Sequence, residues 1–195
     1  MDYRIKRREP LYQGFFTLEA LTIEHARFDG GRMRVRREHF ERGDAAAVLL
    51  FDPARDEVLL LEQFRVGPVA RGEHPWLIEI VAGIIDPGET PHQAAMREAR
   101  EEAGYEPRRL KPLGRFYASP GASSERLFLF LGEVARGEAV GAGGGVRQEC
   151  EDIRLFWVSR REAVRMVCDG RIASAAPMIA IMRAFGTLPV YDASG

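Results

Sequence analysis

Acidic side chains gather within one turn of a predicted helix near the middle of the chain. Glu98 and Glu102 are four residues apart, so on an α-helix they share one face, and Glu101 lies at its edge. Like charges at this spacing cost roughly 0.2 to 0.5 kcal/mol per pair in an isolated helix, and a bound cation removes that cost. Oxygen donors of this kind suit Mg²⁺, which prefers carboxylates, waters and phosphate oxygens. The competing interpretation is an exposed helix on which Arg97 and Arg100 neutralise the glutamates.

The acidic turn belongs to a longer pattern. A glycine and a Pro-Gly turn precede it at set distances, and a helix-ending glycine follows it. The pattern resembles the Nudix box, Gly-x5-Glu-x7-Arg-Glu-U-x-Glu-Glu-x-Gly-U, in which U is apolar. Every fixed position agrees, namely Gly83, Glu89, Arg97, Glu98, Glu101, Glu102 and Gly104, with Ala99 and Tyr105 at the U positions. The sequence therefore resembles the Nudix hydrolases.

This resemblance implies a loop–helix–loop that binds divalent cations and cleaves a diphosphate bearing another group. The implied metal ligands are Ala82, Glu98, Glu101 and Glu102, with Glu98 and Glu102 as the main ones. Arg97 is assigned to catalysis together with Glu98 and Glu102. Glu89 is expected to orient Arg97 and to be a further candidate for metal binding. The implied cofactor is Mg²⁺, with Mn²⁺ as a substitute.

Three segments outside the box resemble bacterial ADP-ribose pyrophosphatases, and the likeness runs from about Glu9 to Phe185. They are Leu11–Phe16, Tyr117–Glu125 and Glu149–Asp152. Pro120 stands sixteen residues after Gly104, a spacing associated with that subgroup. The resemblance implies hydrolysis of ADP-ribose to AMP and ribose 5-phosphate by a homodimer that exchanges its N-terminal sheet. Alternative substrates are GDP-mannose, another ADP-sugar, NADH or an oxidised nucleotide, and a ligand sensor without activity is the remaining alternative.

Substrate-binding residues are proposed on the same basis. Arg37 and Arg65 are candidates for the diphosphate, because a guanidinium fork suits phosphate oxygens. Either arginine is otherwise a surface or structural residue. Phe15 is expected to stack on adenine, with a place in the core as the alternative. Glu125 is expected to accept a hydrogen bond on the adenosine side, and Pro120 completes the predicted substrate site.

The general base is expected outside the box. Metal ions lower the pKa of a bound water, and a carboxylate within reach takes the remaining proton. Because the box glutamates serve as ligands, the resemblance places the base at Glu149, with Glu151 as the close rival. Both follow the glycine-rich segment Gly137–Val146, whose composition predicts a flexible loop.

The elements that position these residues are readable from local signals. Thr90 is a predicted N-cap, Pro91 suits the first helical position, Gln93 completes a capping box, and Gly104 is a left-handed C-cap. Further helices are predicted over Arg160–Asp169 and Ala175–Phe185. Strands are predicted over Leu11–Ala26, Met33–Phe40, Ala45–Phe51, Glu57–Phe64, Trp76–Ala82, Leu113–Ala118, Leu127–Val134 and Ile153–Val158. A Phe28–Gly31 turn joins the first two.

This order predicts an α/β protein, a Nudix α/β/α sandwich around a mixed β-sheet with an N-terminal antiparallel β appendage. We expect residues 1–43 to form the N-terminal β-sheet domain and residues 44–190 the hydrolase domain.

Composition sets the remaining expectations. The 195 residues are 46% hydrophobic and carry a net charge of −1, which gives no reason to expect nucleic acid or a membrane as partner. The apolar runs are too short to span a bilayer, and no signal-peptide pattern is seen. With two cysteines, Cys150 and Cys168, a reducing cytoplasmic location is expected. The early basic residues are interpreted as a solvated arm, namely Arg4, Lys6, Arg7 and Arg8.

Overall fold

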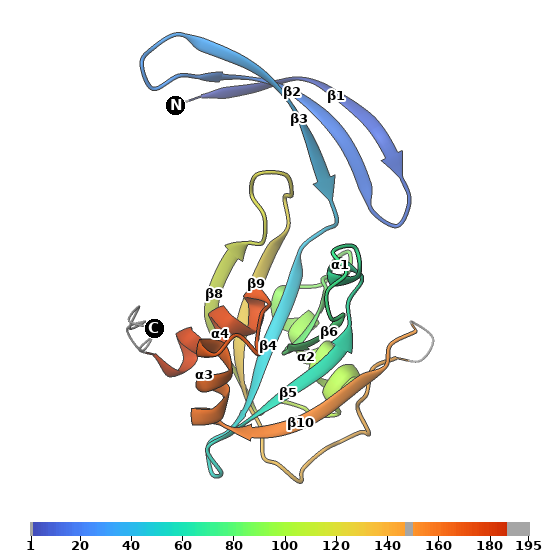
Figure 1. Cartoon of the computed structure of the whole chain (residues 1–195), viewed down its shortest axis with the longest axis vertical. Coiled ribbons are helices and arrows are strands. Elements are labelled where there is room, and N and C mark those ends of the chain that lie inside the picture. Colours follow the sequence, from blue (N-terminus) through green and yellow to red (C-terminus); the bar gives the residue numbers. More distant parts are fainter. Residues whose placement is uncertain (1, 147–149, 187–195) are drawn as a thin grey trace. The chain divides into compact units, whose positions relative to one another are not determined.

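The computed structural model describes residues 2–146 and 150–186, which form two compact units (Figure 1). The first unit runs to Asp44 and includes Phe116–Arg126. The second comprises Ala45–Arg115 and the chain from Leu127 onward. The domain boundary after residue 43 stays a prediction.

The first unit is built on a three-stranded antiparallel sheet. Its strands are β1 (Tyr3–Gln13), β2 (Thr17–Ala26) and β3 (Arg32–Glu41), in the order β1-β2-β3. The predicted turn between β2 and β3 is confirmed, and the left-handed φ angles of 90° and 77° at Gly30 and Gly31 explain its glycines. The single strand predicted over Leu11–Ala26 is wrong, because a turn at residues 14–16 divides it between β1 and β2.

The basic residues near the start form part of β1 rather than a solvated arm, which corrects the expectation from composition. Two of the four, Lys6 and Arg8, pair with acids of the neighbouring strand. Lys6 Nζ lies 3.6 Å from Glu24 Oε1, and Arg8 Nη1 lies 2.6 Å from Glu19 Oε1. Cross-strand pairs of opposite charge favour a sheet, and a run of charges read alone does not reveal them.

The second unit contains a mixed sheet. Its strands are β4 (Ala45–Asp52), β5 (Glu57–Phe64), β6 (Trp76–Glu79), β7 (Val81–Ile84), β8 (Arg109–Tyr117), β9 (Arg126–Glu133) and β10 (Ile153–Ser159). The main order is β10-β5-β4-β9-β8, with β6 beside β5 and β7 beside β4. β4 and β9 are parallel, whereas β4 is antiparallel to β5 and β7. The strand predicted over Trp76–Ala82 is therefore two strands, because β6 and β7 pair with different neighbours.

Helices cover both faces of this sheet (Figure 1). They are α2 (Pro91–Ala103), α3 (Arg160–Cys168) and α4 (Ala175–Phe185), with a short unpredicted helix α1 (Val66–Val69) after β5. Alternate residues of β4 share a core cluster with alanines of α2, while Phe51 packs against Phe185 of α4 with ring centroids 5.1 Å apart. The predicted α/β/α sandwich around a mixed sheet, with an N-terminal antiparallel sheet, is confirmed.

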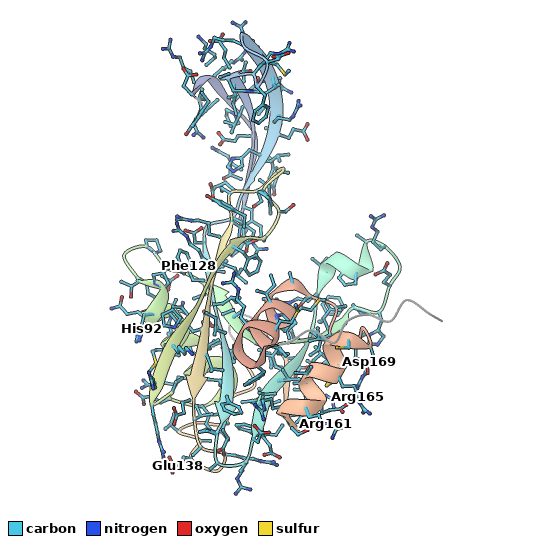
Figure 2. All side chains as sticks on the ribbon, turned by 90° about the vertical axis from the view of Figure 1, so that its left-hand side faces the viewer. His92, Phe128, Glu138, Arg161, Arg165 and Asp169 are labelled. Carbon is cyan, nitrogen blue, oxygen red and sulfur yellow. The ribbon has the colours of Figure 1, made fainter. Side chains whose placement is uncertain are left out.

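The outer side of α3 is charged. Figure 2 labels Arg161, Arg165 and Asp169 there, whereas Ala163 and Met166 are buried against the sheet. Across residues 2–146 and 150–186, none of the helices is long and apolar enough to cross a membrane.

Candidate active site

Helix α2 is fixed at both ends by the residues predicted to cap it. The Thr90 hydroxyl accepts a hydrogen bond from the Gln93 N–H, and the Gln93 side chain accepts one from the Thr90 N–H at 2.9 Å. Gly104 ends the helix with φ 72° and ψ 20°, the left-handed conformation that glycine adopts at low cost. The helix therefore begins and ends at set positions, which fixes the direction of each glutamate.

Small side chains seat this helix against the sheet. The alanines on its inner face are fully buried or nearly so, namely Ala94, Ala95, Ala99 and Ala103. Since they project little, the helix lies close to β4 and β7, and the neighbouring residues Glu98 and Glu102 are drawn into the protein. Burial of two carboxyl groups one turn apart is costly unless something compensates for their charge.

Glu102 is the more deeply buried of the two, with 2% of its surface exposed. Its Oε2 accepts a hydrogen bond from the backbone N–H of Ala82 on β7, at 3.0 Å. Burial raises the pKa of the Glu102 carboxyl well above its usual range. The Ala82 N–H opposes this rise in pKa, whereas the negative charges of Glu98 and Glu151 add to it.

Glu98 is 8% exposed and lies beside a counter-ion. Arg97 Nη1 donates a hydrogen bond to Glu98 Oε1 at 2.6 Å. Burial raises the pKa of the Glu98 carboxyl to about 7, although Arg97 opposes the shift. Neither carboxyl group therefore has enough positive charge nearby to offset its burial and keep its pKa in the usual range.

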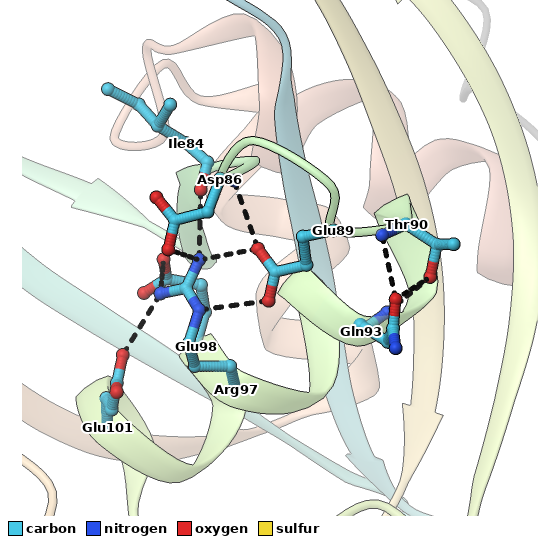
Figure 3. A network of polar contacts seen from close by, with 8 residues as sticks. All are labelled: Ile84, Asp86, Glu89, Thr90, Gln93, Arg97, Glu98 and Glu101. Carbon is cyan, nitrogen blue, oxygen red and sulfur yellow. Dashed lines mark hydrogen bonds and ion pairs between the residues drawn. The ribbon is translucent and has the colours of Figure 1, made fainter.

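Arg97 is the centre of a polar network that joins the loop before α2 to the helix (Figure 3). Its Nε and Nη2 each donate to Glu89 at 3.1 Å, Nη2 donates to the Ile84 carbonyl at 3.0 Å, and Nη1 reaches Glu101 at 3.1 Å. The Arg97 hydrogen bonds lower the pKa of the Glu89 carboxyl. This geometry agrees with the expected orientation of Arg97 by Glu89.

Gly83 leaves room for the Glu98 carboxylate. A Cβ atom at Gly83 would lie 1.7 Å from Glu98 Oε1 and 2.0 Å from its Cδ. Any larger residue therefore displaces the carboxylate. The glycine is needed at this position for space rather than for an unusual backbone angle.

The carboxylate oxygens of Glu98 and Glu102 are suitable ligands for a hard divalent cation. The two groups are buried one helical turn apart, and both need a positive charge nearby. Within the part of the chain that the structure describes, however, no three His, Cys, Asp or Glu side chains converge closely enough to hold a metal ion. Instead, oxygens of Glu98 and Glu101 bond to Arg97. Mg²⁺ commonly takes one or two carboxylates and fills its other positions with waters and phosphate oxygens.

The comparison with known proteins identifies the family. The NUDIX domain model matches residues 41–180, which is more than half of the chain. The chain belongs to the Nudix family.

Among its relatives, an ADP-ribose pyrophosphatase of Escherichia coli is 48% identical over 183 residues, covering 92% of this chain and 86% of that protein. A GDP-mannose pyrophosphatase of Klebsiella pneumoniae is 35% identical over 180 residues, covering 92% of this chain and 89% of that protein. A crystal structure of an ADP compounds hydrolase matches with a TM-score of 0.73 at 20% identity, covering 94% of this chain and 92% of that one. That structural likeness supports the fold alone. The recognition of a Nudix hydrolase from the box is confirmed.

In this Nudix hydrolase, Arg65 lies in the same unit as helix α2. It follows β5 and binds Glu79 of β6, with Nε at 2.9 Å and Nη2 at 2.6 Å from Glu79 Oε2. Gln63 donates to the same oxygen at 3.2 Å. The positive charge of Arg65 also acts on Glu102, where it opposes the rise in pKa. Sequence reasoning missed Glu79, since only the pairing of β5 with β6 brings it to Arg65.

The four other predicted substrate residues belong to the first unit, so their placement against the α2 carboxylates stays a prediction. Phe15 is 86% exposed, and its ring meets Phe16 edge-on at 4.7 Å. Arg37 is exposed on β3, and Pro120 is exposed in the loop after β8. Glu125 is buried.

An arginine that sequence reasoning missed lies beside Glu125. Arg42 Nε lies 3.3 Å from Glu125 Oε1, and the guanidinium lies over the Phe16 ring at 5.2 Å. No spacing signal connects residues 42 and 125 in the sequence.

Of the two predicted bases, Glu149 lies outside the described residues. Glu151 is described, and its Oε2 accepts a hydrogen bond from the Val146 N–H at 3.0 Å. Its negative charge acts on Glu98 and Glu102, adding to the raised pKa of each. Glu151 is thus electrostatically coupled to both buried glutamates.

Proposed function

We propose that this Nudix hydrolase cleaves ADP-ribose to AMP and ribose 5-phosphate, using Mg²⁺. The observation that supports ADP-ribose as the substrate is the 48% identity, over 92% of the chain, to a protein named ADP-ribose pyrophosphatase. The buried pair Glu98 and Glu102 supports the reaction class, since both carboxylates lie one helical turn apart and need a counter-charge.

Each residue has a proposed part. Glu98 and Glu102, with Glu101 and the Ala82 backbone beside them, would hold the metal. A bound divalent ion neutralises the diphosphate and lowers the pKa of a water molecule. Arg97 keeps Glu98 and Glu101 in place through its Nη1 hydrogen bonds.

Substrate contacts and proton transfer come from other residues. Arg65 and Arg37 would bind phosphate oxygens, because a guanidinium donates two parallel hydrogen bonds. Phe15 would stack on adenine, and Glu125 would accept a hydrogen bond from the adenosine side, with Pro120 in the same loop. Glu149, with Glu151 as the close rival, would take the proton of the attacking water.

A substrate panel tests the proposal. Purified protein with Mg²⁺ is given ADP-ribose, an ADP-sugar, GDP-mannose and NADH, and nucleotide products are separated and quantified. ADP-ribose should have the highest kcat/KM and release AMP, and in ¹⁸O-labelled water the label shows which phosphorus is attacked. Mn²⁺ in place of Mg²⁺ should also support turnover. No AMP from ADP-ribose under either metal would refute the assignment.

GDP-mannose hydrolysis is the second candidate, because relatives with that name are 35% to 37% identical to this chain. It would replace the first if GDP-mannose gave the higher kcat/KM in the same panel.

We also propose a homodimer that uses the N-terminal sheet. The strand register puts Ile5, Ile23 and Val35 in one row across a face of this sheet, beside a second row in which His25 lies between Tyr3 and Met33. Tyr3 is 72% exposed, and an apolar face of this kind is normally covered by another layer. Light scattering should give the mass of a dimer, and a monomer would contradict the proposal. The two free, exposed cysteines fit a reducing, cytoplasmic location.

A further inference from the structure

The glycine-rich segment Gly137–Val146 is anchored on helix α2, although its composition predicts a flexible loop. The backbone N–H groups of Val140 and Gly141 donate to the Gly104 carbonyl at 2.7 and 3.2 Å, and that of Gly144 donates to the Glu102 carbonyl at 2.8 Å. Carbonyls at the end of a helix have no partner within it. The segment therefore supplies the missing donors for the helix that carries Glu98 and Glu102.

Glycine is required on both sides of this contact. A Cβ at Gly143 would lie 2.7 Å from the carbonyl carbon of Ala103 and 2.8 Å from its oxygen. A Cβ at Gly104 would lie 2.4 Å from the Gly141 oxygen. Because these neighbours are backbone atoms, they cannot rotate away as a side chain would. The two backbones thus approach more closely than a side chain on either would permit.

The same segment holds Glu151. The Ile153 N–H donates to the Gly144 carbonyl at 3.2 Å, and the Val146 N–H donates to Glu151 Oε2 at 3.0 Å. A Cβ at Gly145 would lie 2.6 Å from the Cβ of Glu151. At the other end of the segment, Glu138, labelled in Figure 2, pairs with Arg108. Direct contacts therefore connect helix α2 to Glu151 through the glycine-rich segment.

We propose that Gly143 is a positioning residue, which fixes the Glu151 carboxylate relative to Glu98 and Glu102 through its close contact with Ala103. This inference rests on the proposed diphosphate hydrolysis, because it assigns Glu151 a part in that reaction. Gly104 and Gly143 allow the segment to pack directly against the backbone at the end of helix α2. An anchored segment keeps the Glu151 carboxylate in place before substrate arrives, so that no ordering is required in each catalytic cycle.

A pair of glycine variants in the same segment tests the contact. Gly143→Ala introduces the collision with Ala103 at a left-handed φ of 63°. Gly137→Ala is the matched control, because its φ of 101° is also positive but no atom lies within 4 Å of the added Cβ. For ADP-ribose we expect Gly143→Ala to lower kcat by about 10- to 100-fold, the scale of a misplacement near 1 Å. KM should change less than about twofold, and the control should match the wild type.

A double-mutant cycle separates positioning from general damage. If Gly143 acts through Glu151, the Gly143→Ala loss should almost vanish in a Glu151→Gln background. Equal losses in both backgrounds, or no loss in either, would overturn the positioning role. If circular dichroism shows that Gly143→Ala is unfolded, Gly145→Ala replaces it, since its Cβ meets Glu151 itself. Wild-type protein that releases no AMP refutes the proposed function instead, so the two failures are distinguishable.

Discussion

Replacing Gly83 by alanine should remove activity while leaving the fold intact. The new Cβ would lie 1.7 Å from Glu98 Oε1, so the carboxylate must move by about 1.5 Å or more to regain ordinary contact. That movement breaks its 2.6 Å hydrogen bond with Arg97. Because a displacement of about 1 Å near reacting groups can cost about 100-fold in rate, we expect kcat to fall at least that far.

The effect on stability should be small by comparison. Losing a charge-assisted hydrogen bond costs roughly 1.5 to 3 kcal/mol, and alanine gains about 0.5 to 1 kcal/mol over glycine in a strand. The net loss of about 1 to 2 kcal/mol corresponds to a fall in Tm of only several degrees in a chain of this size. The assay is therefore kcat for ADP-ribose over a range of Mg²⁺ concentrations, with Tm from thermal unfolding.

Gly67→Ala is the matched control, since no atom lies within 4 Å of its added Cβ and its φ is not left-handed. It should keep wild-type kcat, with a Tm that is unchanged or slightly higher because alanine favours helix α1 more than glycine does. If Gly83→Ala retains kcat within about threefold at saturating Mg²⁺, the Glu98 carboxylate does not need its observed position. That result would refute the assignment of Glu98 as a metal ligand.

Three further predictions concern the same carboxylates and Arg65. Glu102→Gln should lower kcat by at least about 100-fold while Tm holds or rises, because a buried acid becomes a neutral amide; unchanged turnover would contradict its metal role. The second prediction concerns metal-free protein, measured in the presence of a chelator. The pKa of Glu98 is raised to about 7, so the folded state keeps a proton that the unfolded state releases near pH 4.5. Its contribution is full below pH 4.5 and is lost as the pH rises through 7, so the free energy of unfolding should fall by about 1.4 kcal/mol between pH 6 and pH 8. Denaturant titrations should show this slope in wild type and a weaker one in Glu98→Gln; equal slopes would argue against burial of an ionisable Glu98. Glu79→Gln should raise KM for ADP-ribose by roughly tenfold with little change in kcat, because Arg65 loses the carboxylate that orients it; an unaltered KM would mean that Arg65 does not bind substrate in this orientation.

The sequence predicted helix α2 almost to the residue because its signals are local. Thr90, Pro91 and Gln93 act within one turn of each other, and Gly104 ends the helix through its own backbone conformation. Such caps need no knowledge of the rest of the chain. The boundaries of β5 and α4 were predicted equally well, because the apolar periodicity of each segment stops where the element ends.

The features that were missed depend on partners far away in sequence. β1 was not recognised because the acids that neutralise Arg8 and Lys6 lie on β2, across the hairpin. The role of Glu79 required the register between β5 and β6. Composition likewise predicted a flexible glycine-rich loop, since it cannot show that these glycines meet the end of α2.

The single arginine of the box divides its glutamates into two groups. Glu89 and Glu101 are held by Arg97, and Glu98 shares the same guanidinium at 2.6 Å. Glu102 receives only the Ala82 N–H among its described hydrogen bonds and is the most buried of the four. An arriving cation must therefore compete with both Arg97 and a proton for Glu98, whereas at Glu102 it competes mainly with a proton. Metal affinity should accordingly rise with pH through both carboxyl groups and depend on Arg97 through Glu98 alone, which gives two residues of one helix turn different roles in the same site.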